Sequence, residues 1–344
     1  MAEFEKMKYE WNENLTSDEW DGFLSQFHGH PLQSTKWGDA KKLSCGIHDH
    51  RWIAFKNGTP YFMARFEERW LFKLLKIAWI PKGPVILDKH YESTLHKEFL
   101  SRLKKRGFFL CATNPWEKIE FMDKINSAFH TIWLDLTIKK EKLWESLHKK
   151  CRSDIKRAKK LGVVIEKSKS LDDLNLFYQI CESISKSKGF SLSTSLQLMS
   201  HLLSNNHDQV ESYLFVARHE GHFCGGAFLM RCGESVHYLW GAVNRDFAHL
   251  CIGEALQWEI IEWAISKNCK KYDLEGISAK QNGGVDKFKK KLGGTVIAYP
   301  SIQIYPLHTG RKIIICLTKI YLFLQPKMTR VCRQLLTRSE KRGN

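Results

Sequence analysis

Two carboxylates near the end of the chain, Asp273 and Glu275, are the residues best suited to proton transfer. They lie at the end of a strand-like stretch, KYDLEG, and a carboxylate placed there can accept the proton of an incoming ammonium group. Either could equally cap the N-terminus of a helix. Glycines at both ends of the following segment, 276–284, let its backbone approach a substrate closely. Four lysines come next and would also fit the solvated start of a helix: Lys287, Lys289, Lys290 and Lys291.

The histidines do not predict a metal centre. His28 and His30, and likewise His48 and His50, are paired in turn-like stretches, whereas zinc needs four ligands in a preformed shell. The sequence HEGH at 219–222 fits the tip of a β-hairpin rather than the helix of a zinc protease. The chain has no P-loop and no G-x-S-x-G motif. We therefore expect neither a metal nor a bound cofactor.

Basic charge dominates the composition. The 344 residues include 54 Lys and Arg against 37 Asp and Glu, a net charge of +17, and the 12 Trp, 20 Phe and 10 Tyr exclude a disordered chain. Most of the excess charge lies in residues 139–160, with ten basic and three acidic residues, and in 311–344, with nine basic residues and one acidic. This concentration predicts a polyanionic partner, nucleic acid or an anionic membrane. A solvated helix face with a frayed basic tail is the alternative.

Cysteine usage and the chain termini indicate a cytoplasmic protein. The ten cysteines form no C-x-x-C pair and mostly lie in apolar stretches, so we expect them to be reduced. The charged N-terminus does not resemble a signal peptide, and the apolar stretch 313–324 is too short to span a bilayer. With the basic residues after Pro326, this stretch could lie at the inner face of the plasma membrane. It could equally complete the core of the first domain.

The first half of the chain contains a recognisable order of elements. A β-hairpin is predicted around Asn57-Gly58, because this dipeptide suits a tight turn. A strand over 77–87, a helix over 91–106 and a strand over 108–113 follow. Helical sequence precedes the hairpin.

The second half repeats this order about 165 residues later. A hairpin over 212–233 is followed by a strand over 235–243, a helix over 253–267 and a strand over 271–276. This is the order of a GNAT core, in which a mainly antiparallel sheet splits open at a parallel pair of strands. We therefore predict an α/β (α+β) protein with two tandem GNAT-like domains, whose mixed, mainly antiparallel sheets are flanked by helices.

The predicted boundaries follow from the repeat. The first domain is expected over residues 1–137, the second over 138–307, and a basic tail over 308–344. Completion of the first domain by 308–325 is the alternative for part of that tail. Between the repeats, one amphipathic helix is predicted up to Gly162, which is a typical C-terminal stop. Its apolar face would contain Leu143, Leu147, Cys151, Ile155 and Ala158.

Five stretches, in this order and spacing, resemble the signature motifs of the peptidoglycan bridge-forming aminoacyltransferases, the Fem family. The stretches are HPLQSTKWGDAKK, WIPKGPVILD, KKCRSDIKRAKKLGV, YDLEGI and DKFKKKLGG. The resemblance implies transfer of an aminoacyl group from aminoacyl-tRNA to an amine of a peptidoglycan precursor. Many members carry a long helical arm in the second domain. The stretch 139–213 has room only for ordinary helices, which leaves contact with tRNA to the core, the basic helix and the tail.

The resemblance also assigns roles to residues. It implies a catalytic part for Lys289, as the cation beside the tetrahedral oxyanion, and for Phe288, while Asp273 is our candidate proton acceptor. Substrate binding is expected at Lys41, Trp37, Lys82, Asn114 and Gln197. Contact with tRNA is expected at Lys149, Lys150, Arg152, Lys156 and Lys159.

Departures from the family pattern leave the acceptor open. Asn114 stands where some relatives have an aspartate, and Ser193, Thr194 and Gln197 stand where some have an arginine and an aromatic residue. A lipid-linked precursor then fits as well as a nucleotide-linked one. For Trp37, ordinary core packing is the alternative to stacking on a nucleotide.

Two other functions remain as alternatives. An acyl-coenzyme A-dependent N-acyltransferase acting on a cell-envelope sugar or peptide would need the phosphate-binding start of a helix. The nearest match, 250–255, has Leu250 where Arg or Gln belongs and the acidic Glu254 among the N–H donors. A catalytically inactive RNA- or membrane-binding protein is the third possibility, against which the intact F-K-x-x-[FL]-G-G motif speaks.

Overall fold

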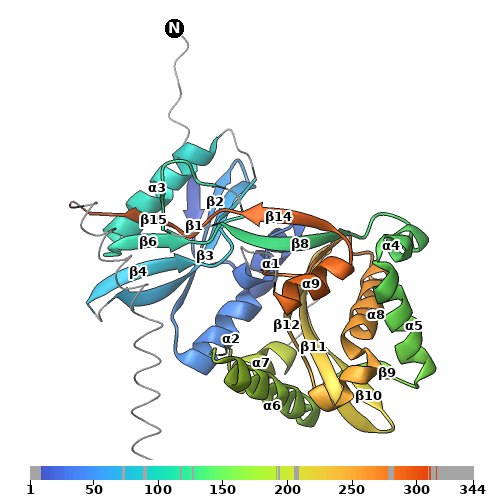
Figure 1. Ribbon diagram of the computed structural model, residues 1–344. Coiled ribbons are helices and arrows are strands. Elements are labelled where there is room, and N and C mark those ends of the chain that lie inside the picture. The colour runs from blue at the N-terminus through green and yellow to red at the C-terminus, as the bar shows by residue number, and fades with distance from the viewer. Residues whose placement is uncertain are drawn as a thin grey trace, which may run out of the picture.

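The computed structural model contains two sheets flanked by helices, one formed mainly by each half of the chain (Figure 1). It describes residues 9–71, 74–87, 91–116, 118–125, 128–190, 192, 194–204, 209–277, 283–308, 310 and 315. Ser193 and nearly all of the predicted tail 308–344 lie outside these residues. Within them, no helix is both long enough and apolar enough to cross a membrane.

The first sheet has the predicted hairpin at its centre. In spatial order it contains β1 (Glu10–Asn12), β2 (Asp49–Lys56), β3 (Thr59–Leu71), β4 (Leu75–Ile80), β6 (Leu110–Thr113), β15 (Gln303–Pro306) and β7 (Asp123–Lys124), while β5 (Val85–Ile86) also pairs with β3. All neighbours are antiparallel except β4 and β6. The helix α3 (Glu92–Lys105) buries Leu95, Phe99 and Leu103 against one face of the sheet.

The second sheet repeats this plan. In spatial order it contains β14 (Thr295–Tyr299), β8 (Phe129–Asp135), β13 (Lys271–Asp273), β12 (Ser235–Val243), β11 (His222–Cys232), β10 (Val210–His219) and β9 (Val164–Ser168). Its parallel pair is β12 and β13. Each sheet therefore has its parallel pair at the equivalent place, which confirms the prediction of two tandem GNAT-like units.

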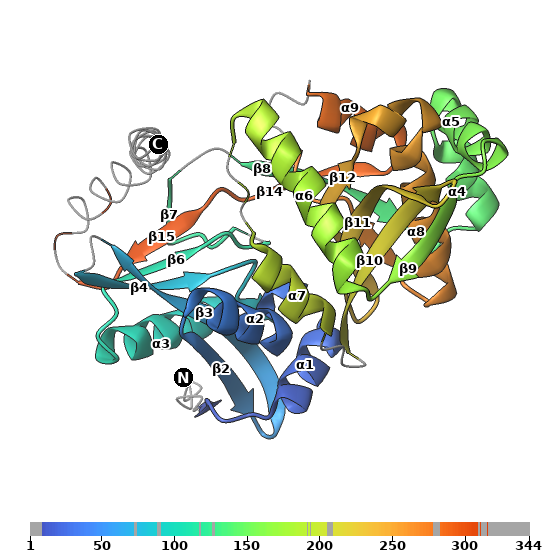
Figure 2. The same ribbon diagram turned by 90° about the horizontal axis from the view of Figure 1, so that it is seen from below.

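Helices cover both faces of the second sheet. One face carries α4 (Lys140–Ser146), α5 (Lys149–Lys160) and α8 (Ile252–Ser266), and the short helices η3 (Arg245–Leu250) and α9 (Gly284–Lys291) flank it. The other face carries α6 (Leu171–Lys188) and α7 (Leu196–Ser204). Figure 2 shows α7 beside α1 (Ser17–Gln26) and α2 (Thr35–Cys45), which follow one another through η1 (Pro31–Gln33). Buried side chains of α1, α2, α6 and α7 form one core cluster, so the two halves are packed together.

The strands cross the predicted domain boundaries in two places. β8 ends before residue 137 yet lies in the second sheet, and β15 returns from the second half to the first sheet. The connection between β14 and β15 therefore runs from one sheet to the other. The boundaries themselves remain predictions.

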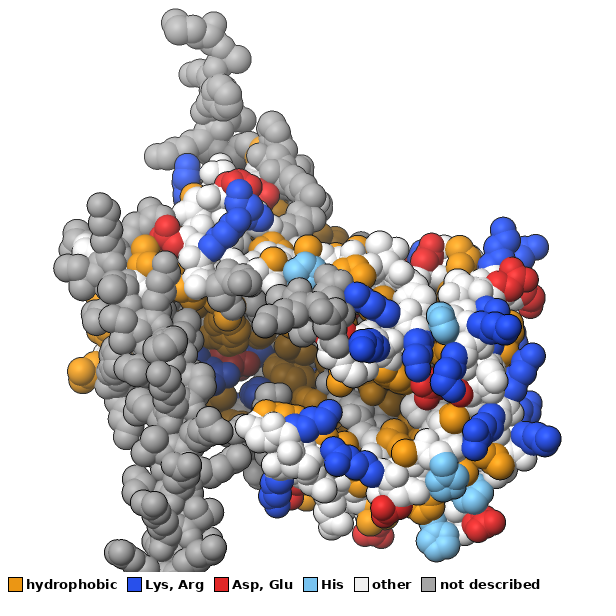
Figure 3. Space-filling model, viewed as in Figure 1, with side chains coloured by type: hydrophobic (Ala, Val, Ile, Leu, Met, Phe, Trp, Pro, Cys, Tyr) orange, Lys and Arg blue, Asp and Glu red, His pale blue; other side chains and the backbone are white. Residues whose placement is uncertain are grey.

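The basic region between the repeats is two helices, not the one that the sequence predicted. Leu147 and His148 have extended backbone between α4 and α5, and the His148 ring accepts the Lys150 N–H at 3.2 Å as an N-cap. The His148 N–H also donates a hydrogen bond to the Lys291 carbonyl at 2.9 Å. This long-range bond has no local signal. All five predicted apolar residues are still buried, and Lys and Arg side chains gather over this part of the surface (Figure 3).

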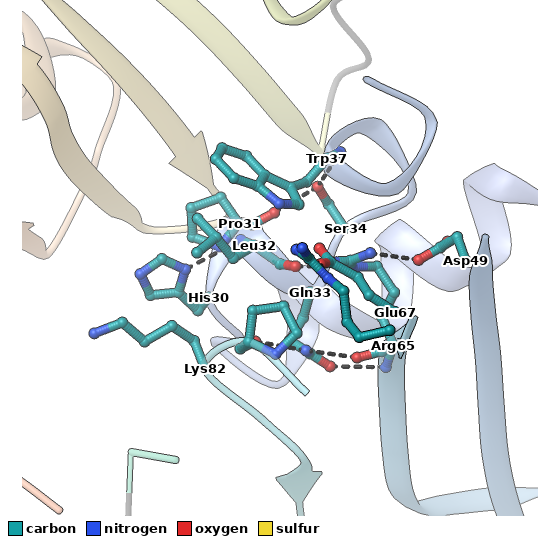
Figure 4. Close-up of polar contacts among 12 residues, drawn as sticks. His30, Pro31, Leu32, Gln33, Ser34, Trp37, Asp49, Arg65, Glu67 and Lys82 are labelled. Carbon is teal, nitrogen blue, oxygen red and sulfur yellow. Dashed lines mark hydrogen bonds and ion pairs between the residues drawn. The ribbon is translucent and has the colours of Figure 1, made fainter. Parts of the chain in front are cut away.

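Gln33, in the L-Q-S motif, forms hydrogen bonds that link β3 of the first sheet to the turn after β4. Its side-chain amide donates to the carbonyls of Arg65 at 2.9 Å and Pro81 at 2.6 Å, and its oxygen accepts the Arg65 N–H at 2.8 Å (Figure 4). Gly83 lies so close that an added Cβ would be 2.6 Å from Cδ of Gln33. The glutamine of one motif and the glycine of the K-G-P motif therefore form one packed unit.

We expect Gln33→Ala to lower the free energy of unfolding by roughly 3 kcal/mol, because three buried backbone groups lose their partner. Urea unfolding followed by circular dichroism measures this. The control is Gln26→Ala at the exposed end of α1, which should change stability by less than about 0.5 kcal/mol. Equal stabilities for the two variants would contradict the role given to Gln33.

Candidate active site

Polar side chains from both halves meet where the parallel strand pairs end. Lys82 follows β4 and His30 precedes η1, whereas Glu275 follows β13. Glu275 Oε1 is 3.0 Å from His30 Nε2, and its Oε2 is 3.9 Å from Lys82 Nζ. We call His30, Lys82, His237, Asp273 and Glu275 the interdomain centre.

Glu275 is the residue that joins the centre. Its backbone is left-handed, with φ of 56°, a conformation that costs a residue with a side chain about 1 kcal/mol or more. Its Oε1 accepts hydrogen bonds from His30 Nε2 and His237 Nδ1, both at 3.0 Å. Burial alone would raise the pKa of Glu275, but these bonds and the charge of Lys82 outweigh it and hold the pKa well below the usual range. Glu275 is therefore ionised at neutral pH.

The hydrogen bonds of His30 fix its tautomer. Nδ1 accepts the Leu32 N–H at 3.0 Å, so the proton lies on Nε2, which donates to Glu275. His30 is 1 % exposed. Burial, together with the nearby His237, lowers its pKa to about 3. His30 is therefore a neutral donor.

Asp273 lies beside Glu275 and His237, and each of its carboxylate oxygens accepts two hydrogen bonds. Oδ1 accepts from the Thr131 hydroxyl and, at 2.8 Å, from the Glu275 N–H. Oδ2 accepts from the Trp133 indole at 2.8 Å and the Tyr299 hydroxyl at 3.2 Å. Burial and the neighbouring Glu275 charge raise the pKa of Asp273. Its contacts are those of a residue that orders the loop, and its role as proton acceptor remains a prediction.

The same atoms could be considered for a metal, since His30, His237 and Glu275 place three ligand atoms within 4.8 Å of one another. A ligating imidazole usually donates its other N–H to a carbonyl or carboxylate. His30 instead accepts an N–H at Nδ1, so its Nε2 carries a proton and has no lone pair for a metal. Lys82 adds a positive charge 3.9 Å from the carboxylate. The arrangement fits a hydrogen-bonded charge cluster better than a metal site.

Lys82 and Asn114, both predicted to bind substrate, lie next to each other. Asn114 Oδ1 accepts the Lys82 N–H at 2.8 Å and holds the K-G-P turn, in which Lys82 has φ of 56°. The Lys82 ammonium lies over the rings of Phe129 and Tyr299, 4.7 and 4.6 Å from their centroids. Asn114 therefore positions Lys82 through the backbone.

Lys289 is unlike the lysines around it. It is 6 % exposed, whereas Lys287 is exposed, and its Nζ donates to the carbonyls of Glu275 at 3.0 Å and Gly276 at 2.8 Å. Burial lowers its pKa to about 8. An ammonium carries three donors, and these two bonds are the ones formed within the described residues. The remaining N–H can serve a ligand.

A cavity of about 180 Å³ lies beside the interdomain centre on the first-domain side. Its walls include His30, Lys82, His96 and Trp116, with apolar side chains such as Val85 and Ile119. The volume suits a small group rather than a whole nucleotide. Figure 3 shows a hollow in the surface between the two halves, with acidic and basic side chains in its depth.

The other predicted substrate-binding residues lie apart from the centre. Trp37 is 7 % exposed, and its ring stacks on Trp240 at 6.2 Å between centroids. The Lys41 ammonium lies 5.6 Å from the Trp37 ring centroid. Gln197 is exposed in the first turn of α7. Trp37 has the contacts of a core residue, and its stacking on a nucleotide stays a prediction.

Lys41 lies above a buried ion network in the first sheet. Arg65, 0 % exposed, binds Asp49 and, at 2.9 Å, Glu67 (Figure 4). Arg69 binds the other oxygen of Glu67 through Nε at 3.0 Å. Burial lowers the pKa of Lys41, although the Glu67 charge opposes this. The network gives Lys41 a fixed, charged surrounding.

The predicted tRNA-binding residues divide into two kinds. Arg152 donates to the carbonyls of Glu145 at 2.7 Å and Leu147 at 2.6 Å, which end α4. Lys150 pairs with Asp154 at 3.0 Å. These two have structural partners. The remaining three are exposed on α5: Lys149, Lys156 and Lys159.

The start of α8, where an acyl-coenzyme A pyrophosphate would bind in an ordinary GNAT enzyme, is obstructed. A Cβ on Gly253 would lie 3.1 Å from the Phe288 ring. The Glu254 carboxyl lies in the first turn, and burial raises its pKa. Phe288 thus fills the space beside the helix start, and Glu254 places an acidic group where a pyrophosphate would need N–H donors.

Sequence reasoning missed His237 and considered His30 only as a metal ligand, a role that it rejected. His30 stands in a turn-like stretch and His237 in an apolar one, and only the fold brings them 4.2 Å apart, ring centroid to ring centroid. A weak signal was present in Glu275, a residue with a charged side chain directly before a glycine at the end of a strand. His237 lies in a predicted strand that would pair with KYDLEG, so its proximity to Asp273 could have been inferred.

Comparisons with known proteins agree with this geometry. Residues 145–290 match the family model described as "Acetyltransferase (GNAT) domain". Over 88 residues the chain is 33 % identical to aminoacyltransferase FemA of Staphylococcus aureus, which covers 24 % of this chain and 21 % of that protein. The chain thus spans about a fifth of the length of the curated relatives it matches.

Solved structures extend the likeness to the whole fold. The crystal structure of FemX superposes with a TM-score of 0.75 at 17 % identity, over 86 % of this chain and 97 % of that one. L-PGS from Bacillus licheniformis gives a TM-score of 0.58 at 12 % identity, over 91 % and 98 % of the two chains. At these identities the likeness concerns the fold alone.

The pKa of His30 predicts a loss of stability in acid. An unfolded histidine titrates near pH 6.5, whereas folded His30 has a pKa of about 3, so protons bind the unfolded chain first. His30 stabilises the fold above pH 6.5, and this contribution is lost as the pH falls towards 3. Between pH 7 and pH 5 the loss is about 2 kcal/mol. Urea unfolding at both pH values should show a smaller loss for His30→Gln than for the unmodified protein.

The matched control is His28→Gln, whose side chain is 61 % exposed. It should keep the pH dependence of the unmodified protein. If His30→Gln does so as well, His30 is not the group that titrates.

Proposed function

Since the chain belongs to the Fem-type family of GNAT-like proteins, we propose that it is an acyltransferase that moves an aminoacyl group from aminoacyl-tRNA to an amine of a peptidoglycan precursor. The observation that carries the proposal is Lys289, a buried ammonium held by two carbonyls of the loop that also contains Glu275. The chain covers only part of FemA, so its activity and substrates are inferred from the site.

The chemistry explains why a fixed cation is needed. When an amine attacks an ester, the carbonyl oxygen gains negative charge in a tetrahedral intermediate. A preorganised donor at that oxygen typically contributes about 3–4 kcal/mol of transition-state stabilisation. Lys289 has a free N–H within the described residues and cannot move far without losing two hydrogen bonds of 3.0 and 2.8 Å.

The acyl donor is inferred from the obstructed start of α8 and from the exposed basic surface of α5. Phe288 and Glu254 occupy the place of an acyl-coenzyme A pyrophosphate. The exposed lysines of α5 present a surface suited to RNA phosphates. The relative from Staphylococcus aureus is named as an aminoacyltransferase, which agrees with an aminoacyl rather than an acetyl donor.

The acceptor is proposed to enter from the first domain. Lys82 and Lys41 are cations suited to the phosphates of a lipid-linked or nucleotide-linked precursor. Such a reaction belongs in the cytoplasm, at the inner face of the plasma membrane if the precursor is lipid-linked. The basic tail 308–344 would favour contact with that anionic surface.

The proposal is tested by offering the protein two labelled donors, total aminoacyl-tRNA and acetyl-coenzyme A, each with a mixture of nucleotide- and lipid-linked precursors. We expect the tRNA to lose its aminoacyl group only when a precursor is present, with label appearing in the precursor. Transfer from acetyl-coenzyme A alone would establish the alternative function.

In that assay Lys289→Met should reduce turnover by roughly 10²–10³-fold with little change in the apparent affinity for charged tRNA, because it removes a transition-state contact. The control is Lys287→Met, two residues away and exposed, which should keep full turnover. Unchanged turnover in Lys289→Met would show that this ammonium only supports the loop.

A further prediction concerns the exposed lysines of α5. Replacing Lys149, Lys156 and Lys159 together with Gln should weaken RNA binding and flatten its salt dependence. A phosphate contact contributes about 0.7–0.9 to the slope of log affinity against log salt, so three lost contacts should lower the slope by roughly 2–3. Filter binding with uncharged tRNA at several salt concentrations measures this.

The control changes charge equally on another helix, with Lys97, Lys104 and Lys105 of α3 replaced by Gln; all three are exposed. This triple variant should retain most of the slope. If both triple variants lower it equally, RNA binding follows net charge and α5 is no specific surface.

A further inference from the structure

We infer that His237, held in place by Glu275, is the group that takes the proton from the acceptor's ammonium, with Nε2 as the accepting atom. This inference rests on the proposed function and adds to it the base that neither the motifs nor the comparisons supply.

The tautomer of His237 follows from its partner. Its Nδ1 lies 3.0 Å from Glu275 Oε1, and an ionised carboxylate can only accept, so Nδ1 carries the proton. Nε2 then holds a lone pair. This is the arrangement in which a carboxylate orients an imidazole and stabilises the imidazolium that forms when Nε2 accepts a proton.

The lone pair of His237 is unoccupied within the part of the chain that the structure describes. His237 is 1 % exposed, and its Nε2 is a buried atom without a hydrogen-bond partner. The neighbouring Trp116 indole N–H is also buried and unpartnered, and the two ring centroids are 6.2 Å apart. A buried polar group left unpaired costs about 1–3 kcal/mol. One acceptor and one donor, side by side and both unpaired, are what a polar ligand group would satisfy.

The position of His237 relative to the cavity gives the ligand a route. His30 and Trp116 are in the cavity wall, and the His237 ring contacts both, with centroid separations of 4.2 and 6.2 Å. His237 therefore lies directly behind that wall. In our inference the acceptor's amino group enters this cavity, and a shift of the Trp116 side chain opens the way to Nε2.

The carboxylates are less suited to accept this proton. Both oxygens of Asp273 are occupied by donors from Thr131, Trp133, Tyr299 and the backbone of Glu275. Glu275 Oε1 receives two imidazole N–H groups, and Oε2 faces Lys82. Glu275 is held ionised by its donors, and the oxygens of Asp273 are already filled, so orientation is the task left to both carboxylates.

The step balances without any further reactant. The acceptor ammonium gives one proton to His237 Nε2, and the free amine attacks the ester carbonyl to form a C–N bond. The tetrahedral intermediate expels the tRNA ribose oxygen as the C–O bond breaks. The ribose oxygen leaves as a hydroxyl after taking the proton from the imidazolium. The attacking nitrogen loses its second proton to solvent as the amide forms. One ester and one ammonium thus become one amide, one alcohol and one released proton, and His237 returns to its starting state.

We expect His237→Gln to lower the single-turnover rate at saturating aminoacyl-tRNA by about 10²–10⁴-fold, the usual contribution of a general base. The affinity for charged tRNA should change little, since the proposed phosphate contacts of the donor lie on α5. In His237→Gly, added imidazole should restore part of the rate by filling the space of the lost ring. The control is His222→Gln at the exposed tip of the β10–β11 hairpin, which should match the unmodified protein.

Glu275→Gln is a second variant that does not depend on filling a cavity. It keeps an oxygen for the His237 N–H but loses the charge, so the rate should fall while imidazole gives no recovery. Unmodified protein that transfers aminoacyl groups, with His237→Gln at the same rate, would overturn this inference and leave the proposed function intact. A folded His237→Gly that is slow and not restored by imidazole also contradicts it. Failure of the unmodified protein with every donor would instead overturn the proposed function.

Discussion

The hydrogen bonds from one histidine of each half to the single carboxylate of Glu275 are the constraint on which the arrangement of the molecule depends. His30 comes from the first half and His237 from the second, each 3.0 Å from the same oxygen. Separating the halves would remove the His30 hydrogen bond and the nearby Lys82 charge from an ionised, largely buried carboxylate. Removing one partner of a buried charge typically costs about 3–5 kcal/mol. The two GNAT-like units therefore behave as one body at this point.

The same turn also sets the position of the Lys289 ammonium. Because Glu275 has left-handed backbone, its carbonyl and that of Gly276 both point to Lys289 Nζ, at 3.0 and 2.8 Å. The side chain of Glu275 orients the histidines while its main chain orients the lysine. With a pKa of about 8, Lys289 is still mostly charged at neutral pH. It also holds its proton less firmly than an exposed lysine, which makes it a stronger hydrogen-bond donor to a developing oxyanion.

The sequence predicted what depends on local pattern. The Asn57-Gly58 hairpin, the helix near 91–106 and the stop at Gly162 all occur, because turn residues and periodic apolar side chains act within a few residues. The single helix over the basic region was wrong, because the bond between the His148 N–H and the Lys291 carbonyl joins residues far apart in the chain.

Only some of the residues of the candidate site could be predicted from local sequence patterns. Lys289 and Asn114 stand in motifs and could be named in advance, whereas the partnership of His30 with His237 exists only after the two sheets pack. The L-Q-S motif shows the same limit. Its glutamine was a marker of family in the sequence, and the structure shows that it holds Arg65 and Pro81 in place beside Gly83.

The distribution of charge between the interior and the surface separates the chemistry from recognition. A cavity of about 180 Å³ is too small for a whole tRNA or precursor. In the proposed reaction only the end of the acceptor that carries the amine would enter it, and the bulk of both substrates would remain outside. There the net charge of +17 acts on phosphates through a long-range field that salt screens over about 10 Å. In the proposed reaction, burial of the interdomain centre would limit hydrolysis of an activated ester and strengthen each hydrogen bond to the reacting atoms. Surface lysines can therefore change without altering the reaction, whereas the buried groups around Glu275 depend on one another for both position and charge.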